Sequence, residues 1–211
     1  VAFKFDLEKA FDNVNWDFLK SCLRDFGFPD VTTRLFMHCG TSSNFSLLWN
    51  DNKMPPFKPS HGLRQGDPLS PYLFILCMEK LSIAINDAVH KRTWAPIHIS
   101  DNGPRLSHLL FVDDVLLFTA AKNSQLRFIS DLFARFSRTS GLKINLSKSR
   151  AFYSTRTPQS KINKLTSITV ATCFLEKQTV KQNRSLGASF IRPHLDPFLL
   201  HADCLAPSKH L

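Results

Sequence analysis

The sequence predicts an α+β fold, in which a β-sheet carries helices on one of its faces. Strand-like and helix-like segments alternate along the chain in the order β-α-α-β-α-β-β-α-β, and strands mixed with crossover helices are typical of this class. A turn signal, Asp101-Asn102-Gly103, lies between two strand-like segments and indicates a hairpin. With 211 residues, of which 43% are hydrophobic, the chain is long enough for one domain with a substantial core and an appended tail.

Four elements are predicted in the first quarter of the chain. Residues 2–7 alternate between apolar and polar side chains and form a strand. Residues 16–26 form a helix, which ends at Gly27 because glycine and the nearby proline stop helices. A second helix is predicted over 29–39 and a strand over 44–49, before a turn at 50–52.

The middle of the chain contains the longest predicted helix. Residues 61–71, with two glycines and two prolines, form a loop that leads into a helix over 69–89. Strands over 97–100 and 105–111 flank the first hairpin turn. A return strand over 115–120 completes a second hairpin, whose turn is an aspartate pair.

A further helix and two short strands follow the second hairpin. Asn123 is the expected N-cap of this helix, and Gly141 is expected to end it. Short strands are predicted over 142–144 and 151–154. Residues 171–211 show no clear periodicity.

The net charge is strongly positive and unevenly distributed. A formal charge of +10 and a pI of about 9.6 favour a polyanionic partner such as nucleic acid, or an acidic membrane surface. The segment from Lys122 to Lys164 contains ten basic residues and one acidic residue, Asp131. This basic block therefore contributes +9 to the positive net charge. No apolar run approaches the roughly 20 residues of a membrane span, and the expected partner is nucleic acid rather than a membrane.

The cysteines and the first residues complete the general expectations. Five scattered cysteines form no CxxC motif, so we expect small buried apolar side chains in a reducing compartment rather than disulfides or a zinc site. The chain begins within a predicted strand and without methionine, which predicts an excerpt from a longer protein.

Two adjacent carboxylates, Asp113 and Asp114, interrupt an apolar run from Leu109 to Phe118. Aspartate is disfavoured in strands, and burying a carboxylate without a partner costs several kcal/mol. We therefore expect both aspartates to be buried and a bound cation to offset the free-energy cost of burying their carboxylates. Asp6 repeats the pattern at the end of the first strand, so three carboxylates are expected to converge at one edge of the sheet.

Carboxylates in such a group would suit hard divalent cations, above all Mg²⁺. Two such ions can activate an attacking oxygen and stabilise a leaving one during an in-line displacement. The residue types alone therefore predict a metal-dependent transfer reaction.

Four motifs in fixed order resemble those of reverse transcriptases, in the LINE-type (non-LTR) retrotransposon branch and its plant members in particular. They are Asp6 with Phe11 five residues later, and residues 62–71 (GLRQGDPLSP), 111–114 (FVDD) and 141–149 (GLKINLSKS). The resemblance covers residues 1–155 and implies a polymerase palm, a ferredoxin-like antiparallel sheet with helices on one face. It implies that the fingers and most of the thumb are missing, and that 156–211 is a degenerate or partial thumb, with Leu186-Gly187 as a faint primer-holding motif. Val112 departs from the alanine that this branch usually has.

The resemblance implies roles for particular residues. Asp6 and Asp113 correspond to metal ligands, and Asp114 to a third, less essential carboxylate, around two Mg²⁺ ions, with Mn²⁺ as a possible substitute. Phe11 corresponds to the gate under the sugar that excludes a ribonucleotide, although an ordinary core phenylalanine fits the sequence too.

Further implied roles concern the nucleotide and the nucleic acid. Gln65 and Gly66 correspond to the loop that contacts the incoming nucleotide and the template; an ordinary helix-entry loop is the alternative. Arg64 is expected either to contact phosphate or to be solvated. Lys148 is expected either to aid pyrophosphate departure or to contact the nucleic-acid backbone.

The resemblance thus predicts an RNA-directed DNA polymerase that uses an RNA template, a DNA primer and dNTPs. Two alternatives remain open at this point: a group II intron maturase-type reverse transcriptase, and an inactive transposon-derived remnant that at most binds nucleic acid. The missing regions predict weak or no activity for this chain alone. An intracellular, nuclear location is expected from the resemblance only.

Overall fold

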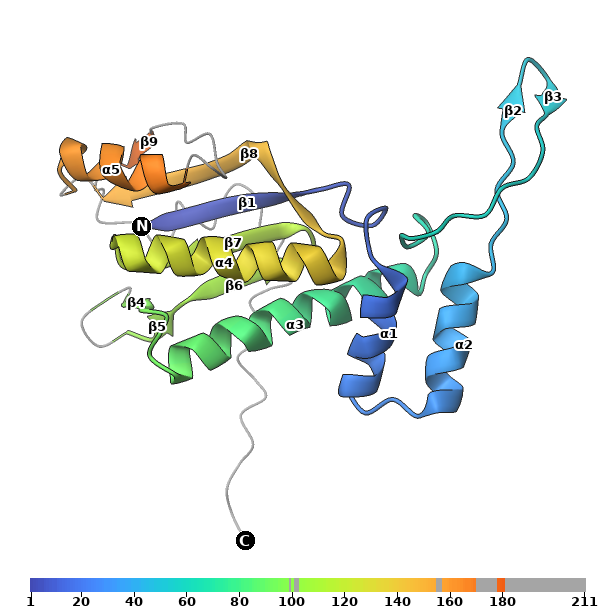
Figure 1. The fold of residues 1–211 in the computed structure, drawn as a ribbon, viewed down its shortest axis with the longest axis horizontal. Helices are drawn as coiled ribbons and strands as arrows, with labels where there is room; N and C mark the ends of the chain where they lie inside the picture. The colour runs from blue at the N-terminus through green and yellow to red at the C-terminus, as the bar shows by residue number, and fades with distance from the viewer. Residues whose placement is uncertain (99, 101–102, 155–156, 170–177, 181–211) are drawn as a thin grey trace, which may run out of the picture. The chain divides into compact units, whose positions relative to one another are not determined.

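A five-stranded sheet with the order β6-β7-β1-β8-β9 forms the centre of the computed structural model (Figure 1). The structure describes residues 1–98, 100, 103–154, 157–169 and 178–180. Strand β1 is antiparallel to both of its neighbours, β7 and β8, and β6 is antiparallel to β7. The predicted α+β class with an antiparallel sheet is confirmed. The strands are β1 (Ala2–Glu8), β6 (His108–Phe111), β7 (Asp114–Phe118), β8 (Lys143–Ser154) and β9 (Gln178–Val180).

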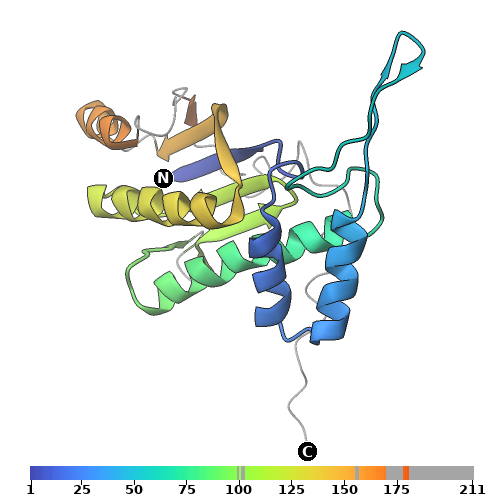
Figure 2. The ribbon, with the colours of Figure 1, turned by 45° about the vertical axis from the view of Figure 1, so that its right-hand side comes forward.

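Helices cover one face of this sheet, as predicted. Alternate residues of β1, namely Phe3, Phe5 and Leu7, are buried in the core that these helices share, because successive strand side chains point to opposite faces. Figures 1 and 2 show α3 and α4 on the same side of the sheet, with α1 packed against α3. The helices are α1 (Trp16–Asp25), α2 (Asp30–Thr41), α3 (Ser70–His90), α4 (Asn123–Ser140) and α5 (Gln159–Thr169).

Two small hairpins lie outside the main sheet. Strands β2 (Leu48–Trp49) and β3 (Asn52–Lys53) form the tip of an arm (Figure 2). Their turn residues Asn50 and Asp51 both have positive φ, +47° and +62°, as a type I′ hairpin turn requires. Strands β4 (Ile97–His98) and β5 (Arg105–Leu106) pair at the hairpin predicted around Asp101-Asn102-Gly103.

Helix ends follow the expected chemistry in part. The Asn15 side-chain oxygen caps α1 by accepting hydrogen bonds from the backbone N–H groups of Asp17 (2.8 Å) and Phe18 (3.1 Å). The prediction that Asn123 caps α4 is wrong: Asn123 is the first helical residue, and the N-cap, Lys122, makes no side-chain capping bond. Gly141 does end α4, with a φ of +80°.

The two short strands expected after α4 are one long strand, β8. Its pairing with β1 shifts register, because Lys4 pairs with Arg150 whereas Asp6 pairs with Asn145. Four residues of β8, 146–149, therefore stand opposite Phe5 alone, and the strand continues past this bulge. The bulge explains why the sequence pattern shows two segments instead of one.

The described cysteines divide between core and surface. Cys22 and Cys77 are buried as expected, but Cys39 is exposed, which corrects the prediction for that residue. Cys173 and Cys204 lie outside the described residues.

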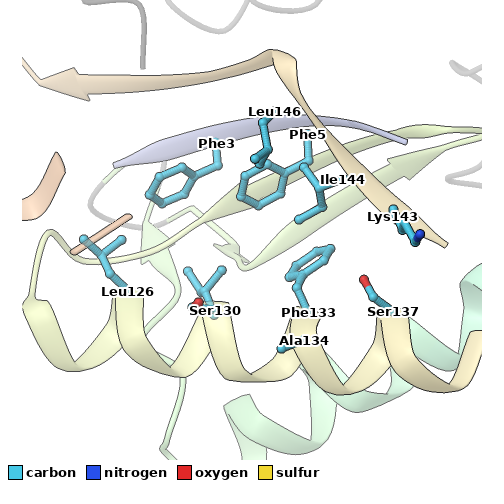
Figure 3. A pocket seen from close by; sticks show the side chains of 11 residues that line it. Phe3, Phe5, Leu126, Ser130, Phe133, Ala134, Ser137, Lys143, Ile144 and Leu146 are labelled. Carbon is cyan, nitrogen blue, oxygen red and sulfur yellow. The ribbon is translucent and has the colours of Figure 1, made fainter. Parts of the chain in front are cut away.

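An apolar cavity of about 220 Å³ lies between α4 and the sheet. Figure 3 shows Phe3 and Phe5 of β1 above it and Phe133 of α4 below it. This cavity belongs to the helix-covered face of the sheet and contains none of the predicted site residues. In the region predicted as a partial thumb, α5 contacts α4, and Leu186-Gly187 lies outside the described residues.

Candidate active site

Asp6 and Asp114 lie directly opposite each other on neighbouring strands. The antiparallel register of β1 and β7 pairs these two residues, and directly paired residues point to the same face of a sheet. Since Phe5 and Val115 point into the core, Asp6 and Asp114 point to the face opposite the helices. Two residues more than 100 positions apart in the sequence thus form one carboxylate pair.

The hairpin turn between β6 and β7 carries the third carboxylate, Asp113. Phe111 pairs with Asp114, so Val112 and Asp113 form a two-residue turn. Val112 has a φ of +51°, a region that β-branched residues strongly avoid. Such local strain is common at functional sites, where the surrounding structure holds it in place.

The expectation that the aspartate pair is buried is wrong. Asp113 is exposed on the turn, and the Asp114 side chain retains 34% of its accessible surface. The residues after the aspartates are apolar because alternate side chains of β7, those of Val115 and Leu117, point into the core. Asp114 lies on the same strand but points to the open face of the sheet. Burial of Asp113 and Asp114 therefore gives no reason to expect a bound cation.

The predicted convergence of Asp6, Asp113 and Asp114 is seen only in part. In the parts of the chain that the structure describes, no three His, Cys, Asp or Glu residues lie close enough together to hold a metal ion. Asp6 and Asp114 form the pair, and Asp113 follows next along the turn. The paired carboxylates offer hard oxygen donors on an open surface, the kind of donor that divalent ions bind while they keep several waters.

Two lysines lie beside the carboxylate pair. The Lys4 Nζ is 3.0 Å from the Asp114 Oδ2, and the Lys148 Nζ is 4.0 Å from the Asp6 Oδ2. Lys148 reaches this position because it lies on the bulge of β8, where the Ser149 hydroxyl also accepts a 3.3 Å hydrogen bond from the Asp6 N–H. Sequence reasoning missed Lys4, although its position two residues before Asp6 in a strand was a usable signal.

A second group of predicted residues meets where the 62–71 loop crosses the segment after β1. The Phe11 ring stacks on Phe74 of α3 at a centroid distance of 4.7 Å, and the Phe11 carbonyl accepts a 2.7 Å hydrogen bond from the Leu63 N–H. The Gln65 amide nitrogen donates a 2.9 Å hydrogen bond to the Asp12 carboxylate. The loop and the Phe11 segment are thus held together by hydrogen bonds, and sequence reasoning had not linked Asp12 to Gln65.

A cavity of about 430 Å³ adjoins this loop and the two segments that lead into and out of the β2–β3 hairpin. Arg64 and Gln65 contribute to its lining, together with the stacked rings of Phe45 and Phe57, whose centroids are 6.0 Å apart. Arg64 and Gly66 are exposed, and Gly66 has a φ of +84° with open space where a side chain would stand. The cavity combines a cation, an amide and aromatic faces, a set that can contact a nucleotide base and its phosphates.

The basic block of residues 122–164 is divided between different surfaces. Arg127, Arg135 and Arg138 lie on the exposed side of α4, which packs on the face of the sheet opposite the carboxylates. Lys148 and Arg150 belong to β8 near Asp6 and Lys4. The sequence had suggested a single block, because linear order does not reveal the face of the sheet.

Residues 1–188 match the protein family described as "Reverse transcriptase (RNA-dependent DNA polymerase)". The chain belongs to this family. The resemblance to reverse transcriptases, drawn from the motifs, is therefore confirmed.

Curated relatives confirm the predicted resemblance to the non-LTR retrotransposon branch. The chain is 29% identical over 143 residues to the retrovirus-related Pol polyprotein from type-1 retrotransposable element R2 of Popillia japonica, covering 68% of the chain and 22% of that protein. It is 30% identical over 147 residues to the Pol polyprotein from type-2 retrotransposable element R2DM of Drosophila melanogaster, covering 68% of the chain and 13% of that protein. A mitochondrial protein of Arabidopsis thaliana is 52% identical over 73 residues, which are 34% of the chain and 60% of that protein. The chain thus spans less than two thirds of each of these relatives.

Similar solved structures establish the fold. Telomerase from Candida tropicalis, in complex with a telomeric RNA fragment, matches 70% of the chain and 25% of its own chain, with a TM-score of 0.55 and 14% identity. Telomerase from Candida albicans gives a TM-score of 0.56 at 13% identity, over 70% of this chain and 26% of that one. The sheet and its helices therefore have the fold of part of a reverse transcriptase palm. None of the helices in the described residues is long and apolar enough to cross a bilayer.

Proposed function

We propose that this chain is the palm of an RNA-directed DNA polymerase from a non-LTR retrotransposon. In the proposed reaction, the 3′-oxygen of a DNA primer attacks the α-phosphorus of a dNTP opposite an RNA template and displaces pyrophosphate. The single observation that carries this proposal is the pairing of Asp6 with Asp114 across β1 and β7, with Asp113 next to them on the turn. That arrangement gathers negative oxygens from distant motifs at one open surface.

The carboxylates fit divalent ions by the chemistry of their donors. Asp6 and Asp113 would hold Mg²⁺, or Mn²⁺ in its place, and Asp114 would contribute a third carboxylate. Bound divalent ions would supply a Lewis acid that neutralises charge developing on the reacting oxygens. The open face of the sheet leaves room for water and phosphate oxygens to complete the coordination.

Other residues of the chain would bind the substrates. Lys148, with 68% of its side chain exposed, can contact a leaving pyrophosphate or a backbone phosphate on the same side as Asp6. Phe11 is fixed by stacking on Phe74, which supports a rigid wall under the sugar that disfavours ribonucleotides. Arg64, Gln65 and Gly66 would contact the incoming nucleotide and the template.

The family relationship extends the proposal to the whole protein. By analogy with relatives that are much longer than this chain, further regions of the whole protein would contribute to binding template and primer. A nuclear location would follow from this role. A maturase-type reverse transcriptase and an inactive remnant remain the competing functions.

Primer extension on an RNA template, with dNTPs and Mg²⁺, tests the proposal. We expect weak extension by the wild-type chain and a loss of more than about 100-fold in Asp113→Asn, because one ligand contributes several kcal/mol of charge stabilisation. Asp131→Asn is the matched control, since Asp131 lies exposed on α4, and we expect its activity to equal wild type. If no variant extends the primer while all bind nucleic acid in a salt-sensitive manner, the remnant function is favoured instead.

A further inference from the structure

Lys4 is the cation closest to the carboxylate pair among the ion pairs of the described residues. Its Nζ lies 3.0 Å from the Asp114 Oδ2, and both side chains are about one-third exposed, at 36% and 34%. The β1–β7 register places Lys4 opposite Leu116, so its side chain reaches diagonally along the sheet to Asp114. Diagonal neighbours in a sheet are within reach of long side chains.

This contact balances an unfavourable arrangement. Asp6 and Asp114 are directly opposed like charges, which destabilise a strand pair. Lys148 offsets the charge of Asp6 only loosely, at 4.0 Å and from a mostly exposed position. Lys4 makes the closer contact, and it extends from the rigid centre of the sheet instead of from a bulge.

We propose that Lys4 is a resident counter-cation of Asp114, which competes with divalent ions for that carboxylate and thereby sets the divalent-ion affinity of the site. This inference rests on the proposed function, because it concerns the same carboxylates. A divalent ion beside Asp114 must either displace the Lys4 ammonium or tolerate its positive charge nearby. Lys4 is thus a positioning residue, which holds Asp114 in place in the metal-free state and weakens metal binding there.

Direct Mn²⁺ binding, measured by the electron paramagnetic resonance signal of free Mn²⁺, tests this inference without any polymerase assay. We expect Lys4→Met to tighten Mn²⁺ binding by up to about fivefold, because Asp114 no longer has to give up a partly exposed ion pair before it binds the metal. Lys4→Arg retains the cation and is expected to bind like wild type. Lys20→Met, on the exposed side of α1, is the matched control and is expected to bind like wild type.

A double-mutant cycle separates a specific Lys4–Asp114 pairing from a general charge effect. In the Asp114→Asn background, Lys4→Met is expected to change Mn²⁺ affinity by less than about twofold, because the carboxylate for which the two cations compete is gone. An equal gain in both backgrounds would overturn the inference, and so would a Lys4→Met variant that binds Mn²⁺ no better than wild type or not at all. Circular dichroism confirms that each variant folds before its affinity is compared.

The outcomes also separate this inference from the proposed function. If the Mn²⁺ cycle behaves as expected but no variant extends a primer, the polymerase proposal fails and the role of Lys4 stands. If extension depends on Asp113 but Lys4→Met leaves Mn²⁺ affinity unchanged, the polymerase proposal stands and the role of Lys4 is refuted.

Discussion

Gly62 is the position where the reasoning about the loop can be tested most sharply. It has a φ of +91°, and a Cβ added there would lie 2.6 Å from the Asp12 carbonyl oxygen, closer than real Cβ contacts come. The Gly62 N–H donates to the Val14 carbonyl (2.8 Å), and the Gly62 carbonyl accepts from the Trp16 indole N–H (2.7 Å). Gly62→Ala must therefore strain the backbone and push apart the loop and the segment that carries Phe11.

The expected cost follows from these contacts. A non-glycine residue at such a φ costs about 1–3 kcal/mol, and each of the two hydrogen bonds that the displacement weakens contributes about 0.5–1.5 kcal/mol. We expect Gly62→Ala to lower the free energy of unfolding by about 2–6 kcal/mol in total. Restriction of the unfolded chain by alanine offsets only a small part of this loss.

Gly66→Ala provides the matched control. Gly66 has a similar φ of +84°, but no atom lies within 4 Å of an added Cβ, so only the backbone term applies there. Urea unfolding followed by tryptophan fluorescence measures both variants. If Gly62→Ala is no more destabilising than Gly66→Ala, the close approach of Gly62 to Asp12 does not hold the loop, and the argument fails.

Two further predictions concern the helix-covered side of the sheet. His108 is hydrogen-bonded with Ser107 (2.8 Å) and Ser82 (3.0 Å), and burial lowers its pKa below the ordinary 6.5. The unfolded chain therefore binds the proton more readily than the folded chain does. We expect the free energy of unfolding to fall as the pH drops below about 6.5. Urea midpoints at pH 7.5 and 5.5 should shift less in His108→Gln, and an unchanged shift would contradict this. Phe133→Ala should cost about 3–5 kcal/mol, because Phe133 packs edge-on against Phe5 beside the existing cavity (Figure 3). Its control is Ser130→Ala, which changes the same cavity wall but removes little apolar surface. If the two changes shift the urea midpoint equally, the loss of Phe133 packing does not have the predicted cost.

Local patterns in the sequence were sufficient for most elements of this protein. The alternation in β1, the helical spacing in α1 and α3, and the glycines that end α1 and α4 depend on residues close together in the chain. The motifs around Asp6, Gln65 and Asp113 indicated the family for the same reason, since each motif is a short segment. The N-cap of α4 was predicted wrongly because the preference of asparagine for the Ncap position does not fix the residue at which the first helical turn begins.

The geometry of the site depended on contacts that no local pattern contains. The sequence by itself determined the family and indicated which residues to expect at the site: Asp6, the Asp113-Asp114 pair at a hairpin, and the loop with Gln65. Only the tertiary structure decided that Asp6 faces Asp114, that Lys4 contacts Asp114, and that Gln65 bonds to Asp12. The register of β1 between β7 and β8 is set by burying Phe3, Phe5 and Leu7 beneath the helices, and that packing fixes which charged side chains meet on the open face.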